Sequence, residues 1–163
     1  MVQKAVVIMG SKSDLEFCDK IRSSLAVYSI PVDLRIASAH RSTEYLLTLL
    51  RSYASGTDEI VLITVAGLSD ALSGVVAAQR LFPVVACPPD IEKHGYAKVF
   101  STAFTPSDVP VAFVNDPQKA AHFVAQIFAL TNPKLKLQIT ELLSEKKKQL
   151  ENQDLEMKKS ENA

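Results

Sequence analysis

The sequence contains little of what marks several classes of protein. It has no tryptophan and two cysteines among 163 residues, and its 18 basic and 18 acidic residues give a formal net charge of zero. The two cysteines, Cys18 and Cys87, stand far apart and belong to no CxxC pair or Cys/His cluster. We therefore expect both thiols to be reduced and buried, and we predict no metal site.

Charge and hydropathy exclude further classes of partner. The balanced charge gives no general attraction to nucleic acid or to a membrane surface, so any anion must be bound locally. No apolar run approaches the roughly 18 residues of a membrane span, and the N-terminal run is too short for the core of a signal peptide. We expect a cytoplasmic protein with no nucleic-acid partner and no membrane partner.

The chain is rich enough in hydrophobic residues, at 47%, to bury the core of one globular domain. Strands are expected at 4–9, 32–37, 59–65, 83–87 and 111–114, and helices at 14–28, 42–53, 71–80 and 117–130. Strands that are buried on both faces and alternate with helices form an open, doubly wound parallel sheet. The expected fold is a single-domain α/β three-layer sandwich of the flavodoxin-like type, over residues 1–131.

Residues 132–163 differ in composition and are expected to form a C-terminal helical extension. Asn132 and Pro133 can start a helix with an apolar stripe, which should pack on the sheet domain or on a neighbouring subunit. From Glu145 onward about half of the residues are charged, and the apolar ones, Leu150, Leu155 and Met157, stand isolated. We expect the helix to fray beyond Gln149.

The loop after the first expected strand, GSKSD at 10–14, suits an anionic ligand. Gly10 allows a tight turn, Ser11 and Ser13 offer hydroxyl groups, and the helix that follows presents unpaired N–H groups. Asp14 can accept a hydrogen bond from a sugar hydroxyl. The alternative is helix capping alone, because serine and aspartate are also typical caps. The loop matches neither GxGxxG nor GxxxxGK[ST], so no dinucleotide or nucleoside triphosphate is indicated.

The loop after the second expected strand, SAHRS at 38–42, should converge with the first, because ligands bind at the carboxyl ends of parallel strands. Arg41 can form a bidentate contact with the same phosphate. His40 is the histidine at a strand's carboxyl end, and histidine suits proton transfer at neutral pH. The alternative for His40 is a loop histidine that is hydrogen-bonded to the backbone.

The loop after the third expected strand is AGLSDALSG at 66–74. Gly67 and Gly74 permit a close approach of the backbone to a ligand, and Ser69 and Asp70 add polar groups. Capping of the next helix by Ser69 or Asp70 explains these two residues equally well.

Two further loops are expected at 87–97 and 104–110, both containing proline. Loops of this kind can close over a site. His94 lies in the first of them and is expected to face solvent.

Taken together, these motifs resemble the PurE family of purine-synthesis enzymes, which act on aminoimidazole ribonucleotide (AIR). The matching motifs are VVIMGSKSD at 6–14, SAHR at 38–41, VAGLSDALSG at 65–74, CPP at 87–89 and AQIFAL at 125–130. Their order and spacing are those of the family, over about residues 4–131. One branch of the family rearranges the N5-carboxylated ribonucleotide, and its third loop resembles AGGAAHLPG, with a second histidine in the site. The other branch adds free CO2, and its loop resembles AGRSNALSG.

The resemblance favours the CO2-dependent AIR carboxylase, because Ala71 stands at the position of the second histidine. The N5-carboxyaminoimidazole ribonucleotide mutase is the alternative. The resemblance implies that His40 is the general acid/base, that Ser11, Ser13 and Arg41 hold the 5′-phosphate, and that Asp14 holds the ribose. The implied substrate-binding residues are Gly10, Ser11, Ser13, Asp14, Ser38, Ala39, Arg41, Ala66, Gly67, Ser69, Asp70 and Leu72. It also implies AIR and CO2 as substrates, no cofactor, and a homo-octamer or homotetramer in which the C-terminal helix reaches a neighbour.

This sequence departs from the family pattern at several positions. The carboxylase branch usually has Arg and Asn where Leu68 and Asp70 stand, often Lys where Arg41 stands, and Gly where Asp108 stands. Leu68 removes a cation, and Asp70 adds an anion near an anionic product unless its carboxyl group is protonated or turned away. An inactive paralogue that binds the ribonucleotide therefore stays open as an alternative.

A flavodoxin-like module without catalysis is the remaining rival. A phospho-receiver needs acidic residues after its first strand and an aspartate at the end of its third, where this chain has Met9, Gly10, Val65 and Ala66. The absence of tryptophan and the few loop aromatics leave a flavin little to stack on. An enzyme is therefore the favoured interpretation.

Overall fold

The computed structural model describes residues 1–161. It divides into two compact units, Met1–Val124 and a second unit that begins at Ala125. This division falls inside helix α6 (Pro117–Ala129), whereas the C-terminal extension was expected to begin at residue 132.

The first unit is built on one five-stranded parallel sheet with the strand order β2-β1-β3-β4-β5. Its strands are β1 (Gln3–Met9), β2 (Val32–Ile36), β3 (Glu59–Val65), β4 (Val84–Ala86) and β5 (Ala112–Phe113). The predicted doubly wound parallel sheet is confirmed.

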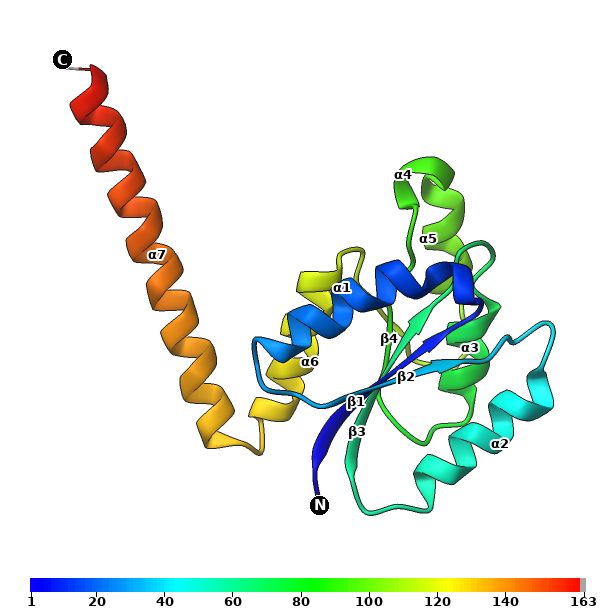
Figure 1. The fold of residues 1–163 in the computed structure, drawn as a ribbon. Helices are drawn as coiled ribbons and strands as arrows, with labels where there is room; N and C mark the ends of the chain where they lie inside the picture. Colours follow the sequence, from blue (N-terminus) through cyan, green and yellow to red (C-terminus); the bar gives the residue numbers. More distant parts are fainter. Residues whose placement is uncertain (162–163) are drawn as a thin grey trace. The chain divides into compact units, whose positions relative to one another are not determined.

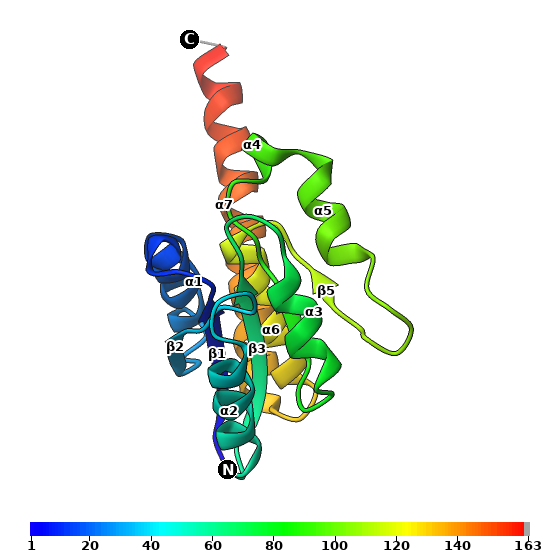
Figure 2. The ribbon, with the colours of Figure 1, turned by 90° about the vertical axis from the view of Figure 1, so that its right-hand side faces the viewer.

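Helices cover both faces of the sheet (Figures 1 and 2). Those of the first unit are η1 (Lys12–Asp14), α1 (Leu15–Ala26), α2 (Thr43–Ala54), α3 (Ala71–Ala78), α4 (Ile91–His94), α5 (Tyr96–Ala103) and the start of α6. On one face, Val6 and Ile8 of β1 pack in a core with Leu50 of α2 and Val76 of α3. The alternate β1 residues face the opposite side, where α1 and α6 lie side by side, because side chains along a strand alternate. Tyr28 Oη and His122 Nδ1 are 2.9 Å apart on that side, joining the end of α1 to α6.

The first three strands end at the same level. Met9, the last residue of β1, pairs with Ile36 on one side and with Val65 on the other, and these are the last residues of β2 and β3. The backbone continues this alignment by one residue, since Gly10 N donates to Val65 O and Ala37 N donates to Met9 O, both at 3.0 Å. The three loops that follow therefore leave one edge of the sheet together.

Two regions differ from the sequence-based expectation. Residues 91–97, expected to belong to a loop, and residues 98–103, for which no element was expected, form α4 and α5, which lie beyond the carboxyl end of β4 (Figure 1). These helices have four and eight residues, too few for a hydrophobic period to show in the sequence. In the second unit, α7 (Pro133–Glu161) is one continuous helix, so the expected fraying beyond Gln149 is not seen. The predicted start is confirmed, because Asn132 Oδ1 accepts from Leu135 N at 3.1 Å.

The two cysteines are free and buried, as predicted. Burial in the apolar core raises the pKa of both Cys18 and Cys87 to about 12. At pH 8 a thiol with such a pKa is ionised in about one molecule in ten thousand. We therefore expect a water-soluble disulfide reagent to modify neither cysteine over minutes in the folded protein, and both at once in urea, as measured by thiolate release. Rapid modification without urea would contradict this placement.

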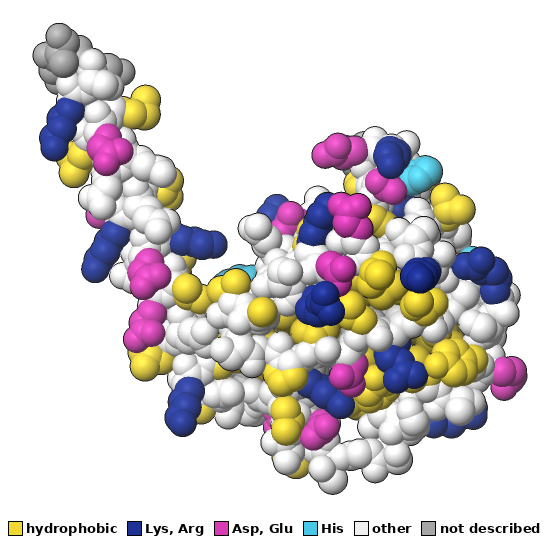
Figure 3. Space-filling model, in the orientation of Figure 1, with side chains coloured by type: hydrophobic (Ala, Val, Ile, Leu, Met, Phe, Trp, Pro, Cys, Tyr) yellow, Lys and Arg dark blue, Asp and Glu magenta, His cyan; other side chains and the backbone are white. Residues whose placement is uncertain are grey.

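Figure 3 shows the distribution of charged side chains on one face of the molecule. On the face drawn in Figure 3, lysine and arginine side chains are interspersed with aspartate and glutamate. Among residues 1–161, no helix is both long enough and apolar enough to cross a membrane.

Candidate active site

The loops that follow β1 and β2 meet at the carboxyl edge of the sheet, as predicted. Arg41 Nη2 donates to the carbonyl oxygen of Gly10 at 3.2 Å, which joins the two loops. This contact uses one of the five N–H donors of the guanidinium group, and the side chain is exposed. Arg41 therefore keeps donors for an anion held over the turn at Gly10 and Ser11.

A compact turn presents His40 at this edge. Ser38 N donates to Ser42 Oγ at 3.0 Å, Ser42 N donates to Ser38 O at 3.0 Å, and Arg41 N donates to Ser38 Oγ at 3.3 Å. Ser42, the expected cap of α2, thus uses its hydroxyl group to close the turn, and its side chain makes no cap hydrogen bond. Ala39 and His40 lie at the tip, and His40 is exposed. None of the residues that the structure describes is hydrogen-bonded to the imidazole ring of His40. The alternative, in which this ring is hydrogen-bonded to the backbone, is therefore not seen among them.

The loops after β1 and β3 also meet, at Asp14 and Gly67. A Cβ atom added to Gly67 would lie 2.9 Å from Asp14 Oδ1, closer than real Cβ contacts. A side chain at this position would displace the Asp14 carboxylate, so glycine allows the two loops to lie this close together. Burial raises the pKa of the Asp14 carboxyl group, and the Lys98 ammonium group acts in the opposite direction. Ser11 Oγ caps η1 by a long bond of 3.4 Å from Ser13 N, and Ser13 itself is exposed.

Within the third loop, two of the predicted substrate-binding residues point inward. Asp70 is 2% exposed, and its carboxylate accepts from Ser73 N at 3.1 Å, from Ser73 Oγ and from Thr102 Oγ1 at 2.5 Å. It is the N-cap of α3, which was the alternative considered for it. Leu72 packs in the hydrophobic core. Ser69 is exposed, and Ala66 and Gly67 line the end of β3. The carboxylate of Asp70 is thus turned inward, toward α3 and α5.

Helix α5 holds this loop in place, and sequence reasoning missed the residues that do so. Ser101 Oγ accepts from Asp70 N at 2.8 Å, and Thr102 donates to the Asp70 carboxylate. Lys98, which is 3% exposed, donates from Nζ to Gly67 O at 2.7 Å and also to Pro89 O. These three residues lie at spacings of three and four along α5, but the helix is too short for this pattern to have identified it in the sequence.

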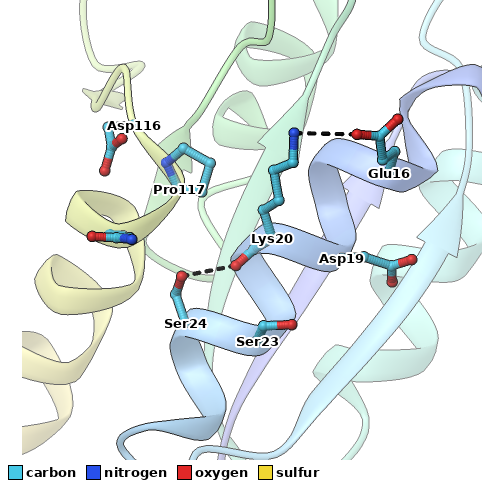
Figure 4. Close-up of a pocket in the computed structure, with 8 residues that line it drawn as sticks. Glu16, Asp19, Lys20, Ser23, Ser24, Asp116 and Pro117 are labelled. Atoms are coloured by element: carbon cyan, nitrogen blue, oxygen red, sulfur yellow. Dashed lines mark hydrogen bonds and ion pairs between the residues drawn. The ribbon is translucent and has the colours of Figure 1, made fainter.

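Two surface hollows flank the site on the side of α1. One, of about 640 Å³, lies between the loops after β1, β4 and β5 and shares Ser13 and Asp14 with the predicted site. Its lining carries five carboxylate side chains and two lysines, which does not suit a phosphate. The other, of about 540 Å³, lies between α1 and the start of α6 (Figure 4). Its lysine, Lys20, is paired with Glu16 at 3.3 Å. Among the described residues, the guanidinium group of Arg41 is exposed and forms no ion pair with a carboxylate.

Asp108, which stands where the family pattern has glycine, has an unusual backbone conformation. Asp108 has a φ of 64°, in the left-handed region that glycine enters without strain. Aspartate tolerates this conformation better than most residues. Its carboxylate lies 3.6 Å from Arg80 Nη2, and both side chains are largely exposed. The substitution therefore lies outside the three converging loops.

Comparisons with known proteins agree with this arrangement. A family model described as AIR carboxylase matches residues 4–149. The phosphoribosylaminoimidazole carboxylase of Archaeoglobus fulgidus is 41% identical over 155 residues, which cover 95% of this chain and 85% of that protein. The N5-carboxyaminoimidazole ribonucleotide mutase of Methanocaldococcus jannaschii is 32% identical over 154 residues, which cover 93% of this chain and 96% of that one. The chain also matches bifunctional animal enzymes, of which it spans about 30%.

The likeness extends to a solved structure. The crystal structure of Treponema denticola PurE superposes with a TM-score of 0.90 at 30% sequence identity, over 96% of this chain and 99% of that one. The family match, the curated relative and the shared fold cover nearly the same residues. The chain therefore belongs to the AIR carboxylase (PurE) family.

Proposed function

We propose that this protein carboxylates AIR with CO2 to give 4-carboxy-5-aminoimidazole ribonucleotide (CAIR) in de novo purine biosynthesis. The observation that carries this function is the convergence of three loops at one edge, with exposed His40 and Arg41 on one loop and Asp14 and Gly67 in contact between the other two. The similarity to a named carboxylase over 95% of the chain supports the same reaction.

His40 is the proposed general acid/base. C4 of the aminoimidazole is an enamine-like carbon that can attack CO2 directly when both are held in a shielded pocket. The new C–C bond leaves C4 with its original hydrogen and the carboxylate, and loss of that proton restores the aromatic ring. The imidazole of His40 takes this proton, and it returns the proton to C4 when the reaction runs in reverse.

The 5′-phosphate is proposed to lie over the turn at Gly10 and Ser11, between the hydroxyl groups of Ser11 and Ser13 and the guanidinium group of Arg41. The bond from Arg41 to Gly10 O already orients that group toward the turn. Asp14 is proposed to accept from a ribose hydroxyl, with Ser38 and Ala39 narrowing the approach to His40.

The third loop is proposed to shape the end of the site where CO2 is bound. Gly67 and Ser69 lie at the edge, whereas Asp70 and Leu72 act through their backbone positions because their side chains point inward. This orientation removes an objection to carboxylase activity, since the Asp70 carboxylate does not face the developing product carboxylate.

The carbon donor is proposed to be CO2, because Ala71 occupies the position of the second histidine of the mutase branch. An assay of the purified protein with AIR or with N5-carboxylated AIR tests this choice. We expect CAIR to form from AIR at a rate that rises with added bicarbonate, followed by absorbance. Conversion of N5-carboxylated AIR without dependence on bicarbonate would establish the mutase instead, and tight ribonucleotide binding without turnover of either compound would establish an inactive paralogue.

The enzyme is proposed to act in the cytoplasm as a homo-octamer or homotetramer. Its two free thiols fit a reducing compartment. Exposed apolar side chains near the site loops, Leu68, Phe100 and Phe104, support an assembly that covers them. The exposed Leu143, Leu150 and Leu155 of α7 support the same conclusion for the second unit.

A further inference from the structure

The buried side chain of Lys98 has no role in the reaction as described so far. Lysine is rarely buried to this degree without specific partners, and Lys98 is 3% exposed. Its ammonium group donates to two backbone carbonyl oxygens, of Gly67 in the loop after β3 and of Pro89 in the loop after β4. A carbonyl oxygen only accepts, so this pair of partners suits the protonated amine.

Burial is the largest effect on Lys98 and lowers its pKa. The carboxylates of Asp90, Asp14 and Asp70 act in the opposite direction and favour the charged form, whereas the Lys93 ammonium group opposes it. Asp14 is the one that belongs to the proposed substrate ligands. Gly67 links Lys98 to Asp14, because its carbonyl oxygen accepts from Lys98 and a Cβ atom added to it would lie 2.9 Å from Asp14 Oδ1.

We propose that Lys98 is the positioning cation of this active site: its ammonium group fixes the loop after β3 through the Gly67 carbonyl and places a positive charge across Gly67 from Asp14, the proposed ribose ligand. This inference rests on the proposed function for the identity of the ligand. The substrate carries a phosphate and the product adds a carboxylate, and Leu68 offers no charge beside them. The ammonium group of Lys98 offsets the negative charge of the substrate and the product. Because it is buried behind the Gly67 carbonyl, it does not occupy space that the substrate needs.

Lys98→Gln distinguishes the effect of the ammonium charge from that of the hydrogen bonds to the Gly67 and Pro89 carbonyls. The glutamine amide donates to carbonyl oxygens but is neutral, so the loop keeps a donor while Asp14 loses the nearby cation. Burial then acts on Asp14 unopposed by Lys98, and the Asp14 pKa rises. At about pH 6 more of Asp14 is protonated, and a protonated carboxyl group is a poorer acceptor for the ribose hydroxyl. We expect KM for AIR to rise several-fold at pH 6 but little at pH 8, and kcat at pH 8 to stay within about twofold of wild type. Lys98→Arg should restore the wild-type profile.

Arg22→Met is the matched control. It removes the same unit charge from an exposed ion pair with Asp19 on α1, and it leaves the Gly67 and Pro89 carbonyls engaged. The pH dependence of KM should stay that of wild type. Far-UV circular dichroism establishes that each variant is folded, and Lys98→Met serves as a second neutral variant if Lys98→Gln does not fold.

Titration of the Asp14 carboxyl carbon by 13C NMR, assigned by its loss in Asp14→Asn, tests the inference without turnover. A higher Asp14 pKa in the neutral variant than in wild type supports the proposal even if no carboxylation is found, in which case the proposed function fails by itself. An unchanged Asp14 pKa, or a loss of activity that is equal at pH 6 and pH 8, would overturn the role of the charge and leave Lys98 as a structural clamp.

Discussion

Replacement of His40 by asparagine is expected to lower kcat for AIR carboxylation by about 10²- to 10⁴-fold, the usual contribution of a general acid/base. Asparagine is polar and of similar size, but it cannot take the C4 proton. The His40 side chain is exposed at the tip of a turn that Ser38 and Ser42 hold closed, so its loss leaves the fold unchanged. Binding of AIR should persist, because Arg41 and Asp14 are untouched.

Three measurements separate these effects: steady-state kcat, the Kd for AIR by titration calorimetry, and the circular dichroism spectrum. His94→Asn is the control, since His94 is also exposed but lies on α4, away from the three converging loops. Its kcat should equal that of wild type. If His40→Asn kept near-wild-type turnover, His40 would have no part in proton transfer, and another residue would have to be sought.

Replacement of Asp70 by alanine is expected to lower the free energy of unfolding by about 2–4 kcal/mol, because an N-cap is lost and buried donors lose a charged acceptor. The Asp70 carboxylate accepts from Ser73 N, Ser73 Oγ and Thr102 Oγ1, all buried. Ser73 Oγ also lies 2.7 Å from Thr64 Oγ1 of β3. The network therefore joins β3, α3 and α5, and alanine would leave a polar cavity among them.

Urea unfolding monitored by circular dichroism measures this loss. Asp70→Asn should lose less, since the amide oxygen still accepts from Ser73 N. Asp154→Ala is the matched control, because it breaks an exposed ion pair with Lys158 on α7 and should change the unfolding free energy by less than about 0.5 kcal/mol. A loss below about 1 kcal/mol in Asp70→Ala would show that the network does not stabilise the fold as described.

The strands, and the edge of the sheet where the site lies, were predictable because a strand that is buried on both faces has a continuous apolar run in its sequence. The run EIVLITV at 59–65 is nearly all apolar, and β3 is buried from Ile60 to Val65. Once the strands were placed, the carboxyl-end rule brought Gly10, Arg41 and Gly67 to one edge without any further information. The helix starts at Asp116 and Asn132 followed from caps, which are local as well.

The remaining features depend on contacts between distant segments. Asp70 can cap α3 or contact a ligand with the same local sequence, and its inward position is decided by Ser101 and Thr102, about 30 residues later. Lys98 reads as a surface lysine until α5 is placed over the carbonyls of Gly67 and Pro89. The eight residues of α5 were too few to identify the helix in advance.

The level ends of β1, β2 and β3 determine how rigidly the reacting groups are anchored. Val7, Ile8 and Met9 are at most 1% exposed and lie in the strand that pairs with both of its neighbours. Amide protons in such a strand exchange with solvent through openings whose free energy approaches that of global unfolding. The tips of the loops can fluctuate on fast timescales. The strand ends from which the loops start separate only when the whole unit unfolds. The geometry that brings His40, Arg41 and Asp14 together is thus maintained by the stability of the entire sheet.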